Sequence, residues 1–140
     1  MEIPPACTRV ETSSRIVRKE RRRLFVLANP NRVRVQVVDV DGCAITDGQR
    51  CDWLFLPPGG KEIYLELKGR HVGEGIRQLE ATISRLSADK GGVPKYCYLV
   101  PTSVRRPMRT EIQVAKDRFD RQYRAKLIVK AKQAEHRIDL

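Results

Sequence analysis

The sequence predicts an α/β domain with a mixed central β-sheet flanked by helices. Two short apolar runs, residues 53–56 and 63–67, lie on either side of a Pro-Pro-Gly-Gly turn, which is typical of a β-hairpin. Apolar residues at helical spacing then follow over residues 75–88, and another apolar run comes at residues 96–100. This order predicts a last strand that lies parallel to the second hairpin strand after a helical crossover.

A helix and a strand are expected before the hairpin. A partial helical stripe of apolar residues predicts a helix over about residues 11–27, which ends at the Asn-Pro-Asn sequence of residues 29–31. Residues 32–40, RVRVQVVDV, alternate polar and β-branched side chains and predict a strand with one buried face. The Asp-Gly pair at residues 41–42 is a turn signal.

A helix and a strand are also expected after the crossover. Residues 110–123 predict a helix with Ile112, Ala115 and Phe119 on one face. Residues 125–138 fit a strand or a continuing helix, and the β-branched pair in residues 127–129 favours a strand. A chain of 140 residues has the length of one domain with a modest core, so we expect residues 1–140 to form a single domain.

The charge of the chain favours a polyanionic partner. The sequence has 28 Lys and Arg against 17 Asp and Glu, a formal net charge of +11. Nucleic acid is the leading candidate, because no helix has the broad apolar face that a membrane surface requires. The residues expected to contact phosphates are Arg70, Arg105, Arg106, Arg109, Arg121 and Arg124. An ordinary solvated basic face is the alternative for the C-terminal part of this set.

The chain shows no targeting signal and no apolar run long enough to cross a membrane, so a cytoplasmic location is expected. Cys7, Cys43, Cys51 and Cys97 form no C-x-x-C pair, which argues against a zinc site and a disulfide framework. We expect four reduced thiols, with the last three in the core.

The hairpin carries the residues with the clearest chemistry. Glu66 and Lys68 are two positions apart on the second strand, so they leave one face while Leu65 and Leu67 leave the other. Asp52 approaches Glu66 from the first strand once the hairpin closes. Two carboxylates suit Mg²⁺ or Mn²⁺, and a lysine orients water or stabilises developing charge. The alternative is an exposed ion pair worth less than about 1 kcal/mol.

Asp52, after Cys51, and the sequence Glu66-Leu67-Lys68 resemble the motif of the PD-(D/E)xK nuclease superfamily, which has the restriction-endonuclease-like fold. The resemblance covers about residues 33–100. It implies an αβββαβ core, here extended by a C-terminal helix and strand. It also implies Asp52 and Glu66 as metal ligands and Lys68 as the residue that assists the attacking water. Cys51 replaces the proline of the motif.

Two further residues enter through this resemblance. Gln78 matches a helical glutamine of RecB-like and lambda-exonuclease-like members, but Thr82 stands where those members have a tyrosine. Some members supply another metal-site carboxylate from the opening helix. Glu20 is the best match and Glu11 the next, although either also fits an ordinary surface glutamate.

Together, these observations predict a nuclease that uses Mg²⁺ or Mn²⁺ to hydrolyse phosphodiester bonds, with DNA preferred to RNA as substrate. The alternatives are a catalytically silent nucleic-acid-binding module and an accessory subunit of the same fold. A homodimer and a partner ATPase or recognition subunit are both left open, as is the choice between internal and terminal cleavage.

Overall fold

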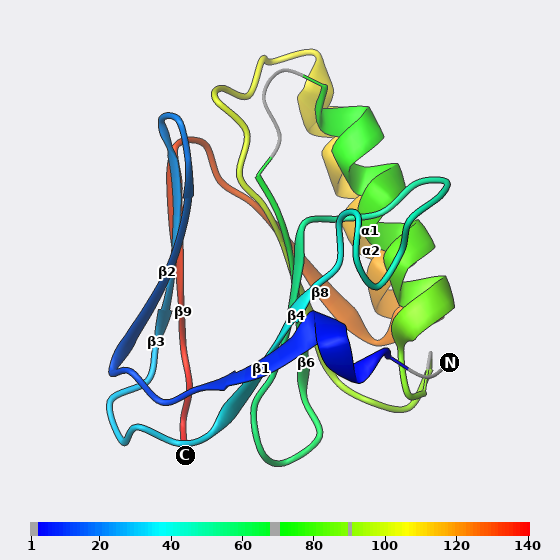
Figure 1. Ribbon diagram of the computed structural model, residues 1–140. Helices are drawn as coiled ribbons and strands as arrows, with labels where there is room; N and C mark the ends of the chain where they lie inside the picture. Colours follow the sequence, from blue (N-terminus) through cyan, green and yellow to red (C-terminus); the bar gives the residue numbers. More distant parts are fainter. Residues whose placement is uncertain (1–2, 68–70, 90) are drawn as a thin grey trace.

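Three layers make up the computed structural model, which describes residues 3–67, 71–89 and 91–140 (Figure 1). A mixed six-stranded sheet forms the middle layer. Two helices cover one of its faces, and a three-stranded sheet covers the other. The predicted α/β domain with a mixed sheet is confirmed, but the helices lie on one face only.

The larger sheet contains the predicted hairpin and crossover. Its strand order is β1 (Thr8–Glu11), β4 (Val35–Asp39), β5 (Trp53–Leu56), β6 (Glu62–Glu66), β7 (Lys95–Leu99) and β8 (Ala125–Val129). The pairs from β1 to β6 are antiparallel, and β6, β7 and β8 are parallel. Parallel neighbours need crossovers, which are α1 (Val72–Leu86) and α2 (Met108–Tyr123). A short 3₁₀ helix, Pro5–Cys7, precedes β1.

The alternation along β6 decides which side chains reach the helices. Tyr64 packs with the buried stripe of α1, whereas Ile63 and Leu65 pack with the smaller sheet. Glu62 and Glu66 share the parity of Tyr64, so their side chains leave the sheet on the helix-covered face. Both glutamates are buried, at opposite ends of the strand.

The opening helix predicted over residues 11–27 is wrong. This segment forms a hairpin of β2 (Arg15–Glu20) and β3 (Arg23–Ala28), and β9 (Gln133–Arg137) pairs in parallel with β3. Ile16, Phe25 and Leu27 are buried against the larger sheet. The segment forms strands despite its partial helical stripe, because the two-residue alternation of a strand places all three side chains on one face of the sheet.

A disulfide joins Cys7, at the end of the 3₁₀ helix, to Cys43 in the turn after β4. The prediction of four reduced thiols is therefore wrong for this pair, and Cys43 is half-buried rather than in the core. Cys51 and Cys97 are buried free thiols, as expected. Among the described residues, no helix is long and apolar enough to cross a membrane.

Candidate active site

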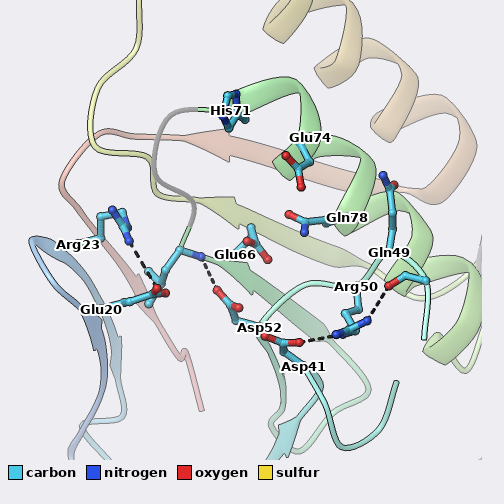
Figure 2. Close-up of a pocket in the computed structure, with 12 residues that line it drawn as sticks. Glu20, Arg23, Asp41, Gln49, Arg50, Asp52, Glu66, His71, Glu74 and Gln78 are labelled. Carbon is cyan, nitrogen blue, oxygen red and sulfur yellow. Dashed lines mark hydrogen bonds and ion pairs between the residues drawn. The ribbon is translucent and has the colours of Figure 1, made fainter. Parts of the chain in front are cut away.

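A cavity of about 580 Å³ opens where β6 ends and α1 begins (Figure 2). Carboxylates, two arginines, a histidine and two glutamines line it, and they come from four separate parts of the chain. The lining residues are Glu20, Arg23, Asp41, Gly48, Gln49, Arg50, Asp52, Glu66, Leu67, His71, Glu74 and Gln78.

Asp52 and Glu66 face this cavity from neighbouring strands. Trp53 pairs with Leu65, so one further step of the register places Asp52 opposite Glu66. At this step the Asp52 N–H donates to the Leu65 carbonyl oxygen at 3.1 Å, and the Asp52 Oδ2 atom accepts the Leu67 N–H at 2.8 Å (Figure 2). This bond fixes the Asp52 carboxylate beside the Glu66 strand. Asp52 and Glu66 therefore line one cavity, and their role as metal ligands stays a prediction.

Helix α1 adds two polar side chains to the cavity. Glu74 and Gln78 are four residues apart, so they lie one turn apart on the same helix face, and both point toward Glu66 (Figure 2). Among the described residues, the buried Oε1 atom of Gln78 has no hydrogen-bond partner. A buried amide oxygen of this kind is ready to accept a hydrogen bond from a ligand or a water molecule.

Thr82 explains how the strand and the helix are joined at this position. Its hydroxyl accepts the Cys51 N–H at 2.7 Å and donates to the Gln78 carbonyl oxygen at 2.8 Å. The residue before Asp52 is therefore tied to the main chain of the residue that carries the amide. Burial, followed by the negative charge of Glu66, raises the pKa of the Cys51 thiol. The thiol stays protonated and is a poor metal ligand.

Glu20 reaches the cavity from the end of β2 rather than from a helix. The Arg23 guanidinium lies 3.6 Å from the Glu20 carboxylate and also donates to the Thr102 hydroxyl at 3.0 Å. Glu20 is about half exposed, with 54% of its side chain accessible. Glu20 therefore lines the cavity from the end of a strand instead of from the expected helix. Glu11 pairs with Arg18 and is not part of the cavity lining.

A second ion pair closes another side of the cavity. Arg50 donates to the Asp41 carboxylate and to the Gly48 carbonyl oxygen, both at 2.8 Å (Figure 2). Asp41 was expected only to form a turn, and the structure adds a place in the cavity wall. The pair holds the segment between β4 and β5 against the site.

The donor set fits a hard divalent cation. Mg²⁺ is commonly held by one or two carboxylates and several water molecules, and Asp52 and Glu66 supply two carboxylates to one cavity. Within residues 3–67, 71–89 and 91–140, no group of three or more His, Cys, Asp or Glu side chains is placed to hold a metal. Asp52 and Glu66 would supply two carboxylates to such a site, and water would complete the coordination.

The predicted basic residues fall into three groups. Lys68 and Arg70 lie outside the described residues. Arg105 lines an adjoining cavity of about 350 Å³ that also contains His71, and Arg106 and Arg109 are exposed nearby, where α2 begins.

The remaining two arginines lie at the other end of α2. Arg121 is in its last turn, and Arg124 caps the helix and donates to the Gly92 carbonyl oxygen at 2.7 Å. This end is about 20 Å along the helix axis from the start of α2. The structure therefore does not bring these two arginines to the candidate site.

Glu74 lines the cavity but was not among the predicted site residues. Glu74 carries a signal that could have found it, because it lies four residues before Gln78 on the same helix face. His71 lines the cavity from the N-cap position of α1. Comparison with models of protein families, with curated proteins and with solved structures finds no match.

Proposed function

We propose that this protein is a divalent-metal-dependent nuclease of the PD-(D/E)xK type that hydrolyses phosphodiester bonds in DNA in preference to RNA. The observation that carries the proposal is that Asp52 and Glu66, from the two sides of the β5–β6 hairpin, line one cavity together with Gln78. The order β4, β5, β6, α1 and β7 supports the restriction-endonuclease-like arrangement. The β2–β3 hairpin takes the place of the opening helix.

Each residue has a distinct part in this proposal. Asp52 and Glu66 hold Mg²⁺ or Mn²⁺, which when bound polarises the phosphoryl oxygen and acidifies a water molecule. Lys68 is two residues after Glu66 in the sequence and is proposed to orient that water or to stabilise developing charge. Gln78 offers its buried amide oxygen as a hydrogen-bond acceptor for the water or the substrate. The exposed arginines at the start of α2 contact the substrate backbone.

The decisive experiment compares two variants that should fail by different routes. Glu66→Gln removes the charge of a proposed ligand, so the affinity for Mg²⁺ or Mn²⁺ should fall together with cleavage. Lys68→Ala should keep metal binding while the chemical step slows by about 10²-fold or more. Calorimetric metal titration and single-turnover cleavage of DNA and RNA substrates, with EDTA as the blank, measure both effects.

The same experiment separates the proposal from a silent binding module. Lys126→Gln, at an exposed position of β8 outside the cavity lining, serves as a surface control that should retain wild-type turnover. If Glu66→Gln and Lys68→Ala also retain it, the activity does not come from this cavity. If purified wild-type protein binds nucleic acid but cuts none with either metal, the silent module is the better description.

A further inference from the structure

The positive charge of the chain is concentrated in three segments that meet beside the cavity. These segments are the β2–β3 turn (residues 19–23), the loop after β7 with the first two residues of α2 (residues 101–109), and the connection between β8 and β9 (residues 130–132). They contain nine Lys or Arg residues and one Glu, which accounts for eight of the eleven surplus positive charges. Charge focused on one side of a cavity steers a polyanion to that cavity.

Hydrogen bonds hold the three segments together. Arg23, which is 8% exposed, donates to the Thr102 hydroxyl at 3.0 Å. The Leu24 N–H donates to the Lys132 carbonyl oxygen at 2.8 Å, and the Lys132 N–H donates to the Pro101 carbonyl oxygen at 2.9 Å. The turn is therefore a fixed neighbour of the loop that carries Arg105, and the same segments lie at one end of the molecule (Figure 1).

The β2–β3 turn presents its cations outward. Glu20 pairs with Arg23 across a two-residue turn, which leaves Arg21 and Arg22 at the tip. Both are exposed, as is Lys19 before them. Arg21 has a φ of 53°, a left-handed conformation that is uncommon for a side chain of this size. Inward, the same turn contributes Glu20 and Arg23 to the cavity wall.

We propose that the β2–β3 turn is a second phosphate-binding element, which holds the DNA backbone next to the cleavage point through Arg21 and Arg22. This inference rests on the proposed function, because it takes DNA as the partner. It assigns substrate positioning to Arg21 and Arg22, to which the PD-(D/E)xK resemblance gives no role. In this arrangement the backbone crosses the cavity between the turn and the arginines at the start of α2.

The test is equilibrium binding of a fluorescent DNA duplex by anisotropy, in EDTA so that no cleavage occurs, over a range of salt concentrations. The turn variant is Arg21→Asn with Arg22→Gln, since Asn tolerates the left-handed conformation. The control is Lys61→Gln with Lys126→Gln, which removes the same charge from exposed positions in the β5–β6 turn and at the start of β8, away from the cavity lining. Thermal melts confirm that both variants fold.

The turn variant should lose on the order of 10- to 60-fold in affinity near 0.1 M salt, and its salt slope should fall by roughly 1.8 if two phosphate contacts disappear. The control should change affinity by less than about threefold, because its charges lie beyond the screening length. A turn variant that binds as the wild type does, with an unchanged slope, overturns the inference. So does a control variant that loses as much affinity as the turn variant.

The failure of this inference and that of the proposed function are distinguishable through Glu66→Gln. If Glu66→Gln abolishes cleavage while the turn variant binds normally, the nuclease stands and the second element is wrong. If the turn variant loses affinity and no protein cuts DNA, the binding element stands and the nuclease is wrong.

Discussion

Gly75→Ala tests whether the close approach of α1 to the sheet positions the cavity side chains. A Cβ atom at Gly75 would lie 2.6 Å from the Leu99 Cδ1 atom and 3.2 Å from the Cδ2 atom. Leu99 is fully buried in β7, so neither methyl group has open space beside it. One turn of α1 must therefore shift away from the sheet, or Leu99 must leave its preferred rotamer.

The expected cost follows from two opposing terms. Alanine in a helix interior is favoured over glycine by about 1 kcal/mol, whereas overpacking of a filled core costs about 1–3 kcal/mol. The overpacking term wins here, so we expect a net destabilisation of about 1 kcal/mol in urea unfolding. Cleavage should also slow, because Glu74 and Gln78 flank Gly75 on the helix that moves.

A matched glycine and a compensating change complete the experiment. A Cβ atom at Gly73 would meet only flexible side chains, chiefly the exposed Glu111 at 2.6 Å and Arg77 at 3.5 Å. Gly73→Ala should therefore be neutral or slightly stabilising. Leu99→Val should rescue part of the loss in Gly75→Ala, a coupling that a double-mutant cycle measures. Equal effects of both alanine substitutions, or additive effects of Gly75→Ala and Leu99→Val, would refute the packing argument.

Three other predictions concern the stability of the fold. Burial, and then the nearby Lys61 charge, lowers the pKa of His136, which forms a hydrogen bond with the Tyr98 hydroxyl at 2.6 Å. The folded state therefore favours neutral His136, and the resulting stabilisation is complete above the unfolded pKa of about 6.5 and is lost as the pH falls below it. His136→Gln should flatten the decline in unfolding free energy between about pH 7 and pH 5, and an unchanged slope would contradict the assignment. Lys95→Met should destabilise the protein by about 3 kcal/mol in urea, because the buried Lys95 ammonium donates to three main-chain carbonyl oxygens that would lose their donor; a loss below about 1 kcal/mol would argue against it. Reduction of the Cys7–Cys43 disulfide, which spans 36 residues, should cost roughly 3–4 kcal/mol, and a double serine variant should show no response to reductant.

Local chemistry made the centre of the fold predictable. The Pro-Pro-Gly-Gly sequence fixes the β5–β6 turn, and the stripe of Ile76, Leu79, Ile83 and Leu86 specifies α1 within a few residues. The two-residue period of β6 then places Glu66 and Tyr64 on the helix-covered face. These features depend on neighbours in the sequence, so no knowledge of the remaining chain was needed.

The N-terminal part was not predictable in the same way. The β2–β3 hairpin gains its stability by packing Phe25 and Leu27 on the far face of the larger sheet and by pairing with β9, more than 100 residues later. Such contacts leave no local period, and the arginines around the turn resemble those of an amphipathic helix. Glu20 was therefore placed near the site for a reason that the structure does not support. The disulfide was missed because its cysteines meet only after folding.

Polar contacts at the start of β6 and β7, the strand ends far from the cavity, fix the carboxyl ends of both helices. Glu62 accepts hydrogen bonds from the Tyr64 hydroxyl, the Ser87 hydroxyl and the Ala88 N–H, which anchors the carboxyl end of α1 to the start of β6. Lys95 similarly joins the start of β7 to the last residue of α2 through the Tyr123 carbonyl oxygen.

Both helices are therefore held to the sheet at their carboxyl ends, and their amino ends lie on the cavity side of the molecule. A small rotation about such an anchor produces its largest displacement at the amino end, about 20 Å away along α1. Glu74 and His71 lie at that amino end, whereas Thr82 lies closer to the carboxyl end that Glu62 holds. Under the proposed function, an adjustment to bound substrate would therefore move the amino ends of the helices at the cavity edge most, while the sheet and the carboxyl ends of the helices stay in place.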